Sequence, residues 1–480
     1  AFSILERGKS RIASELLHRS KLRTEGGIPE EVRREEQKMK REIAYRHQRL
    51  LLEKKRGDER DERRYLELQN DLIRAHRQLL DWEEEMEVVY PQLGRMTGRG
   101  DLPDLDQVQT SLLEEGQIAL NYLVGSENSF LLLISRERVH LSKLPASHHI
   151  APRVEELLTA IRNQDYTGFS TLSYQLYEMV LKPVEGILSG YEELLVVADD
   201  LLHYLPFELL LTQPASDHDA TRWSYLLHDL RVSYTPSLDV YGKRERAQSV
   251  QRDRLLAVAP YAESSSELKH SGGGPGGSDS AGPPLPALPM SGYEAEESAR
   301  IFEQSGRSLI PFRRGRSAVL LMNDEASLER VAEHPLESYG YIHLATHATI
   351  NSAFPELSGI SFADDGSDQQ TLYLGDVANM TFNTELMVLS ACDTGLGPLA
   401  RGEGMIGFSR AFIQSGVRNL LVSLWKVSDR PTSELMVTFY EEMMAGEGRS
   451  EALRRAKLSL IENPATAFPA YWAPFILIGS

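Results

Sequence analysis

The sequence has 480 residues, of which 41% are hydrophobic and 25% charged, and this balance predicts a soluble globular protein of two to four domains. Its single cysteine excludes an intrachain disulfide framework and predicts an intracellular, cytoplasmic location, while no apolar stretch approaches the ~18–20 residues of a membrane span. The net charge of −18 is concentrated after residue 100, where 29 Lys/Arg oppose 50 Asp/Glu. This acidic part is expected to repel nucleic acid and to suit basic protein substrates.

Residues 1–97 are predicted to be helical. The stretch 30–55 is dense in good helix formers, and Gly57 offers a break before a second helix. That helix repeats apolar residues every seven positions, which predicts an antiparallel hairpin with a coiled-coil-like seam. The two rows of the seam are Tyr65, Leu72, Leu79 and Met86, and Leu68, Ala75, Trp82 and Val89. We interpret the hairpin as a packing arm with a solvated charged face, and a partner-binding face is the alternative.

The hydrophobic period changes at about Gly116 to that of an α/β layer. Short strands are expected at 117–124, 129–135 and 138–144, amphipathic helices at 149–163 and 173–188, and a buried strand at 193–198. Because strands alternate with helices, we expect a mostly parallel sheet covered by helices.

A Ser-, Gly- and Pro-rich stretch divides this first half from a second one. Its centre, 262–289, holds too few apolar residues to pack, and we predict a flexible linker over 251–292. The second half, 293–480, is expected to contain helices near 293–304 and 405–414, two further helices before its end, and strands at 341–345, 386–391, 418–425 and 475–479.

Two reactive side chains follow strands of the second half. His347 comes after the strand at 341–345 and Cys392 after the strand at 386–391, and this spacing allows one strand–connection–strand passage. Active sites of open parallel sheets form beyond the carboxyl ends of the strands. A cysteine attacks carbonyl groups as its thiolate, which a neighbouring histidine generates. A packing role for Cys392 is the alternative, and His343 is interpreted as a structural residue inside its strand.

Four strings in order along the second half resemble the CHAT domain, the caspase-like peptidase domain that is related to separase and often follows tetratricopeptide repeats. They are YIHLATHA (341–348), LMVLSACDTGLG (386–397), the 29 residues from Arg401 to Asp429, and YWAPFILIGS (471–480). The string LLVVADDLLHYLPFELLL (194–211) also resembles the amino-terminal half of that domain. The resemblance covers about residues 100–480.

The resemblance implies an α/β, caspase-like fold: a mostly parallel sheet with flanking helices in two halves. Residues 98–250 would be the non-catalytic half and 293–480 the catalytic half, preceded by the helical region 1–97. Since the chain opens on Ala1, that region is expected to be the end of a repeat array in a longer protein. The resemblance also implies that His347 is the general base and Cys392 the nucleophile.

Backbone N–H groups of Ala348 and Cys392 would form the oxyanion hole of such an enzyme. The family usually has glycine after the catalytic histidine, whereas this chain has Ala348. Alanine keeps the N–H group but tolerates a positive φ poorly, so a hole that required such a turn would be weakened.

Asp429 is the candidate for substrate recognition, because the separase-like string LW-x-V-x-D implies an acid that reads a basic residue before the cut. The sequence therefore predicts cleavage after Arg or Lys, for which a carboxylate is the natural partner. Helix capping is the alternative role of Asp429, and Asp393 is the second candidate for the same recognition.

The sequence thus predicts a cysteine endopeptidase that acts on proteins, regulated by a protein or complex through its helical region. The alternative is a CHAT scaffold or sensor that mediates protein–protein interaction without cleaving. No cofactor is expected: the GEGMIG string at 402–407 lies about ten residues past its strand rather than in the tight turn of a dinucleotide site, and the histidines lack the spacing of metal ligands. No membrane contact is expected.

Overall fold

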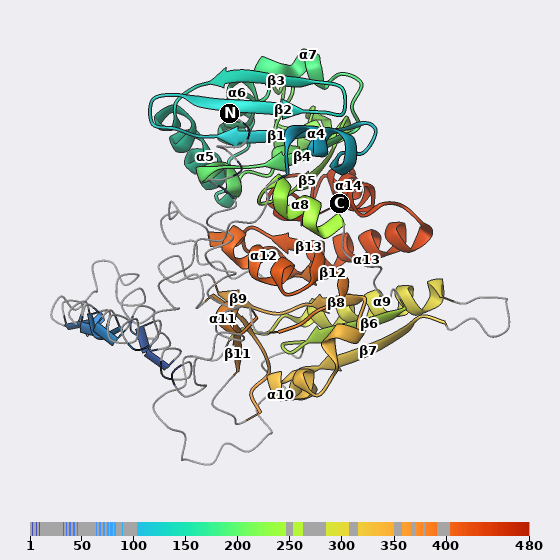
Figure 1. Ribbon diagram of the computed structural model, residues 1–480. Coiled ribbons are helices and arrows are strands. Elements are labelled where there is room, and N and C mark those ends of the chain that lie inside the picture. The colour runs from blue at the N-terminus through green and yellow to red at the C-terminus, as the bar shows by residue number, and fades with distance from the viewer. Residues whose placement is uncertain are drawn as a thin grey trace.

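The computed structural model describes residues 103–245, 253–262, 285–306, 315–349, 358–365, 370–377, 380–390 and 404–479, with isolated helical positions between 2 and 89 (Figure 1). Cys392, Asp393 and most of the predicted helical region and linker lie outside these residues. In the described part, no helix is both long and apolar enough to cross a membrane.

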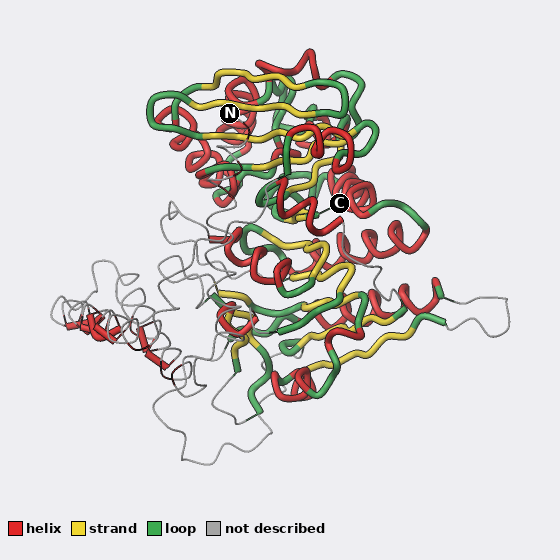
Figure 2. The backbone as a smooth tube through the Cα atoms, in the orientation of Figure 1, coloured by secondary structure: helices red, strands yellow, loops and turns green. Residues whose placement is uncertain are grey.

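One 11-stranded sheet runs through the molecule, in the order β3-β2-β1-β4-β5-β14-β13-β12-β8-β6-β7 (Figure 2). Its strands are β1 (Gln117–Leu123), β2 (Ser129–Ile134), β3 (Val139–Leu144), β4 (Glu193–Val197), β5 (Arg231–Tyr234), β6 (Arg254–Ala259), β7 (Ser317–Met322), β8 (Tyr341–Leu344), β12 (Thr384–Leu389), β13 (Val417–Ser423) and β14 (Phe475–Ile478). Seven of its ten neighbouring pairs are parallel, which confirms the predicted α/β class. A small second sheet contains β9 (Ala348–Thr349), β10 (Gly359–Ser361) and β11 (Thr371–Tyr373).

The strand β14 joins the two halves of the large sheet. It pairs parallel with β5 of the first half and antiparallel with β13 of the second. Since β1, β4 and β5 are mutually parallel, as are β13, β12, β8 and β6, the strands of the two halves run in opposite directions. The carboxyl ends of the two parallel sets therefore lie at opposite edges of the sheet.

Helices flank the sheet as the apolar periodicity predicts. The longer ones are α5 (Ser147–Arg162), α6 (Tyr166–Val180), α8 (Leu238–Glu245), α9 (Pro289–Ser305), α12 (Gly404–Gln414), α13 (Asp429–Ala445) and α14 (Arg449–Glu462). The short ones are α4 (Leu105–Gln107), α7 (Glu185–Leu188), α10 (Leu328–Ala332) and α11 (Leu374–Val377). Helix α5 buries Ile150, Val154, Leu157 and Ile161 along one face, which is the spacing that places side chains on one side of a helix.

The predicted linker over 251–292 is wrong at both ends. Residues 254–259 form β6, a buried strand between β8 and β7, because their near-continuous apolar run suits a strand covered on both faces. At the other end, α9 begins at Pro289, a residue favoured in the first turn of a helix. The residues between, 263–284, lie outside the described part of the chain.

The helical region is described only at scattered positions. Among these, Ile43 of the first predicted helix is buried with Ala75 and Leu79 of the second, and Met39, Leu72 and Trp82 pack against them. Arg46 of the first helix donates a hydrogen bond to the carbonyl of Asp71 in the second. These contacts join the two predicted helices of the hairpin.

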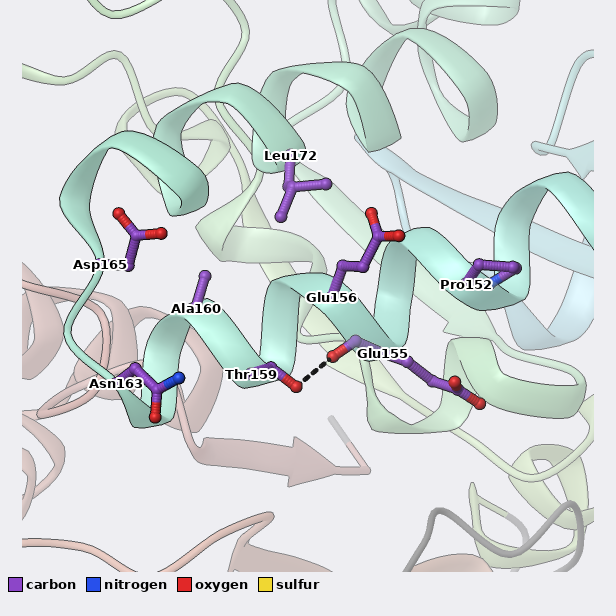
Figure 3. Close-up of a pocket in the computed structure, with 8 residues that line it drawn as sticks. All are labelled: Pro152, Glu155, Glu156, Thr159, Ala160, Asn163, Asp165 and Leu172. Carbon is purple, nitrogen blue, oxygen red and sulfur yellow. Dashed lines mark hydrogen bonds between the residues drawn. The ribbon is translucent and has the colours of Figure 1, made fainter.

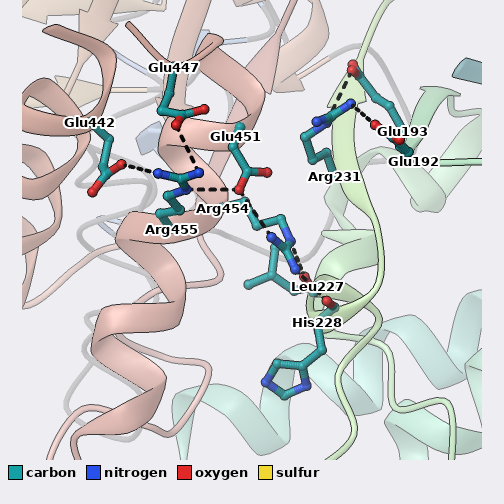
Figure 4. Close-up of polar contacts among 10 residues, drawn as sticks. All are labelled: Glu192, Glu193, Leu227, His228, Arg231, Glu442, Glu447, Glu451, Arg454 and Arg455. Carbon is teal, nitrogen blue, oxygen red and sulfur yellow. Dashed lines mark hydrogen bonds and ion pairs between the residues drawn. The ribbon is translucent and has the colours of Figure 1, made fainter. Parts of the chain in front are cut away.

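Charged side chains of α14 connect the two halves (Figure 4). Arg454 donates to the carbonyls of Leu227, at 2.7 Å, and His228 in the first half. Its neighbour Arg455 pairs with three acids of the second half, Glu442, Glu447 and Glu451. On the same helix, the buried Lys457 pairs with Glu208 of the first half at 2.5 Å. Such a pair stays stable in the interior because each charge has its partner.

Candidate active site

The candidate residues follow two neighbouring strands. β8 and β12 are parallel, and their last residues, Leu344 and Leu389, are register partners. Just beyond, the N–H of Ser390 donates to the carbonyl of Leu344 at 3.0 Å, so that the two chains leave the sheet side by side. His347 lies three residues after Leu344, and Cys392 three after Leu389. Residues 391–403, which include Cys392, lie outside the described part of the chain, so the site is built below around His347.

His347 is held in a fixed orientation. Its side chain lies just after β8 and the residue is 6% exposed. The ring nitrogen Nε2 lies 2.8 Å from the carbonyl oxygen of Pro286, to which it can only donate a hydrogen bond. The ring of Tyr261 packs edge-on against the imidazole, with ring centroids 4.9 Å apart. Burial raises the pKa of Tyr261 to about 12, so this ring stays neutral and apolar toward the histidine.

The Pro286 carbonyl comes from the described end of the predicted linker. Just after it, the N–H of Leu288 donates to the carbonyl of Tyr261 at 2.7 Å, which holds this segment beside β6. Proline fixes its own φ and so restricts the backbone that presents the carbonyl. Sequence reasoning missed this group. Every residue has a backbone carbonyl, so no side-chain motif distinguishes the one that meets the histidine.

Ala348 lies in an extended strand. It forms β9 with Thr349 and pairs antiparallel with Ile360. Among described non-glycine residues, positive φ angles occur at Gln164, Asp200 and Asn323 only. The backbone strain that the sequence suggested for alanine at this position is therefore absent.

The N–H group of Ala348 is not used by the small sheet. The N–H of Ser361 donates to the carbonyl of His347 at 2.9 Å, immediately beside the Ala348–Ile360 pair. This makes Ala348 and Ile360 a non-hydrogen-bonded pair of the antiparallel ladder. The Ala348 N–H then points away from β10.

Asp429 is the first residue of α13, after the N-cap residue Ser428. Its Oδ2 accepts a hydrogen bond from the N–H of Met290, at 2.7 Å, in the first turn of α9. Asp429 thus satisfies an amide at the start of a different helix from its own, which is the capping alternative in a modified form. Burial raises the pKa of Asp429, the Met290 hydrogen bond lowers it, and the nearby Glu294 raises it.

His343 lies inside β8, as the sequence predicted, and is fully buried. Its Nε2 lies 2.9 Å from Oε1 of Glu294, and its Nδ1 lies 3.1 Å from the hydroxyl of Tyr440. Both ring nitrogens therefore have side-chain partners in the core, whereas Nε2 of His347, beyond the end of the strand, donates to a backbone carbonyl.

A pocket of about 410 Å³ lies elsewhere, between α5 and α6 of the first half (Figure 3). Three acids, Glu155, Glu156 and Asp165, are among the residues that line it. None of the candidate site residues contributes to it. In the described residues, no group of three His, Cys, Asp or Glu side chains is arranged to hold a metal ion.

Comparison with models of protein families shows the family of this chain. The model of the CHAT domain matches residues 171–480, which is 310 of the 480 residues. The chain belongs to the CHAT domain family. This confirms the resemblance drawn from the sequence strings, and the match includes both His347 and Cys392.

Curated relatives extend far beyond this chain. It is 26% identical over 355 residues to tetratricopeptide repeat protein 28 of Homo sapiens, and 23% identical over 340 residues to that of Mus musculus. Each match covers 64% of this chain but 13% of the relative. The chain thus spans about an eighth of the length of these relatives.

Among solved structures, the CHAT chain is similar to the Saccharomyces cerevisiae separase–securin complex, with a TM-score of 0.46, 12% identity, and coverage of 78% of this chain and 31% of that one. It is also similar to the Arg-specific cysteine proteinase gingipain R, with a TM-score of 0.38, 10% identity, and coverage of 65% and 67%.

Proposed function

We propose that this CHAT domain is a cysteine endopeptidase. The observation that carries the proposal is the hydrogen bond from His347 Nε2 to the Pro286 carbonyl, at the strand end beside β12. In the neutral ring, donation through Nε2 leaves the lone pair on Nδ1, and this nitrogen is then the base. A base oriented by a third group is the arrangement that activates a cysteine.

The reaction follows from these groups. His347 Nδ1 takes the proton of the Cys392 thiol, and the sulfur attacks the scissile carbonyl to give a tetrahedral oxyanion. The N–H groups of Ala348 and Cys392 stabilise that charge. The C–N bond then breaks, the leaving amine takes the proton from His347, and a thioester remains. Water attacks the thioester after giving its proton to His347, which releases the acid product and restores the thiol.

We assign recognition of a basic side chain before the cut to Asp429, with Asp393 as the second candidate. Asp429 uses Oδ2 for Met290, and within the described part of the chain its Oδ1 has no hydrogen-bond partner. A half-buried carboxylate at this position attracts Arg or Lys more strongly than a fully hydrated one does, because the surrounding dielectric is lower.

The helical region is the proposed route of regulation by a protein partner. Lys9 is buried, its Nζ donates to Asn121 Oδ1 at 2.8 Å and to the carbonyl of Val197 at 2.9 Å, and its own carbonyl accepts from Arg410. Arg410 belongs to α12, the helix that follows the Cys392 stretch in the chain. A partner that displaced the Lys9 segment would therefore act on the helix next to the nucleophile.

The test is covalent labelling with a peptidyl electrophile that carries Arg at its last position, followed by cleavage of a peptide library. We expect labelling at Cys392 that disappears in Cys392→Ala and cleavage after Arg or Lys. The alternative function, a scaffold without cleavage, predicts neither labelling nor turnover in the wild-type chain. The sequence feature that favoured this alternative is the alanine at position 348, which lies in the extended strand β9.

A further inference from the structure

Three buried polar side chains from three separate elements meet in the second half. Glu294 belongs to α9, His343 to β8 and Tyr440 to α13, and their exposed fractions are 2%, 0% and 0%. His343 connects them through the two hydrogen bonds of 2.9 and 3.1 Å described above. We call these three residues the buried triad.

Each element of the triad also carries a group of the candidate site. α9 is preceded by Pro286, eight residues before Glu294, and its first turn holds Met290. β8 leads directly to His347, four residues after His343. α13 begins with Asp429, about three turns before Tyr440. The triad therefore joins the elements that supply the orienting carbonyl, the base and the substrate acid.

One arrangement of protons satisfies both hydrogen bonds of His343. In a neutral ring, the Nε2–H donates to Oε1 of Glu294, and Nδ1 then accepts from the Tyr440 hydroxyl. Burial raises the pKa of Tyr440 well above its ordinary value, so the hydroxyl keeps the proton that it donates. All three groups are then satisfied.

We propose that Glu294, His343 and Tyr440 act as positioning residues that fix α9, β8 and α13 relative to one another, and so set Pro286 and Asp429 against His347. The inference depends on the proposed peptidase function for its kinetic consequences. Its geometric content, the placement of the His347 ring, does not depend on turnover.

Three apolar residues could also fill the space that the buried triad occupies, but they would not form hydrogen bonds, which depend on direction. Buried polar groups cost free energy unless each is paired, and packed hydrophobic residues of similar volume are often as stable. Apolar packing permits small slips between helices, whereas hydrogen bonds hold their atoms within a narrow range of distance and angle. Displacements of about 1 Å at a catalytic group lower rates strongly.

The first experiment compares Tyr440→Phe with Tyr122→Phe. Tyr122 is a matched control: it is fully buried in the other half, and its hydroxyl donates one hydrogen bond, to the carbonyl of Val180 at 3.1 Å. We expect similar losses of thermal stability in both variants. Only Tyr440→Phe should lower kcat/KM for an Arg substrate, by about 3–10-fold, as the loss of one positioning hydrogen bond predicts. Equal kcat/KM in the two variants would overturn the positioning role.

The second experiment uses Glu294→Gln, whose amide oxygen still accepts from His343 but carries no charge. The groups that act on Asp429 are its own burial, the Met290 amide and Glu294. Because Glu294 raises the pKa of Asp429, its neutralisation should move the acid limb of Arg-substrate cleavage to lower pH. If the acid limb of the pH profile does not move in Glu294→Gln, the charge of Glu294 does not act on Asp429 during cleavage.

A third measurement separates the inference from the proposed function. Nitrogen-15 labelling of histidine reports by NMR which ring nitrogen of His347 carries the proton, whether or not the enzyme turns over. We expect a fixed Nε2–H tautomer in the wild type and in Tyr122→Phe, and a shifted or averaged signal in Tyr440→Phe. If the wild type shows this tautomer but no labelling of Cys392, the peptidase proposal is wrong, while the positioning role of the buried triad is still supported. Unchanged His347 signals in Tyr440→Phe would reject that positioning role.

Discussion

The two halves of the sheet present the carboxyl ends of their parallel strands at opposite edges, and they use those edges differently. At the first-half edge, Lys9 inserts between Asn121 and the end of β4, and Asn121 in turn donates to Glu6 at 2.9 Å. Charged side chains from the helical region thus close that edge. At the second-half edge, the imidazole of His347 is held by a backbone carbonyl and an aromatic ring.

The two edges differ in whether the side chains buried there are charged. At the first, an ammonium and a carboxylate are buried together, which costs desolvation and is stable only while both are present. At the second, the groups that hold the His347 ring are a backbone carbonyl and an aromatic ring, and neither carries a charge. Disruption of the first edge should therefore affect folding, and disruption of the second should affect turnover.

The largest effect is expected for His347→Gln. Glutamine keeps a donor for Pro286 but cannot take the thiol proton, so turnover should fall by about 10³-fold or more. Because the side chain is buried, alanine would add a cavity, and glutamine is the cleaner replacement. The measurements are kcat/KM on an Arg peptide and the midpoint of thermal unfolding. A variant that retained a tenth of the activity would show that His347 is not the base.

Lys9→Met tests the opposite edge. It leaves the Glu6 carboxylate buried without its cation, which should cost about 3–5 kcal/mol or undock the segment. The double variant Glu6→Gln/Lys9→Met removes the Glu6 charge together with that of Lys9 and should recover part of the loss, while Asp199, the other acid that acts on Lys9, stays in place. Denaturant unfolding and limited proteolysis near the N-terminus measure both. No difference between single and double variants would contradict the pairing.

The pH dependence of the same edge has a defined sign. Burial lowers the pKa of Lys9 to about 8, below its ordinary value of about 10.4, so the unfolded chain binds more protons between these values. Stability from this group should rise as pH increases from about 8 to about 10.4. This rise of stability with pH should be absent in the double variant Glu6→Gln/Lys9→Met.

The sequence was sufficient for the order of elements that position the candidate site. The apolar runs at 341–345 and 386–391 became β8 and β12, and the helix expected at 405–414 is α12. Local periodicity predicted these elements because their burial follows the same pattern along the chain. Family membership and the mostly parallel sheet also agree with the sequence analysis.

Contacts between segments that are far apart in the chain could not be predicted from the sequence. The hydrogen bonds of His347 with Pro286 and of Asp429 with Met290 join groups 61 and 139 residues apart through backbone atoms. Composition also hid β6, because it lies next to a Gly- and Pro-rich stretch that dominated the interpretation of 251–292. The roles of Cys392, Asp393, Ala348 and Asp429 stay predictions until the variants are measured.

Asp429→Asn is expected to have a smaller, more selective effect. Asparagine still accepts from Met290 but lacks the charge, so kcat/KM for Arg and Lys substrates should fall by about 10–100-fold while neutral substrates change little. Since burial raises the pKa of Asp429, the wild-type preference should be lost as pH falls through a value above the ordinary range of Asp near 3.9. The midpoint of thermal unfolding shows whether the variant keeps the hydrogen bond between residue 429 and Met290. A uniform loss over all substrates would assign Asp429 to folding rather than to recognition.

Ala348→Gly should have the smallest effect on turnover. A glycine would help only if position 348 required a positive φ, and Ala348 instead lies in the extended strand β9 beside Ile360. Both residues supply the same N–H group, so kcat/KM should change by less than about threefold, whereas loss of an oxyanion donor typically costs ~10²–10³-fold. Stability should fall by about 0.5–1 kcal/mol, since glycine loses more backbone freedom in a strand. A tenfold gain in turnover would mean that the strand at 348 leaves its extended conformation when substrate binds.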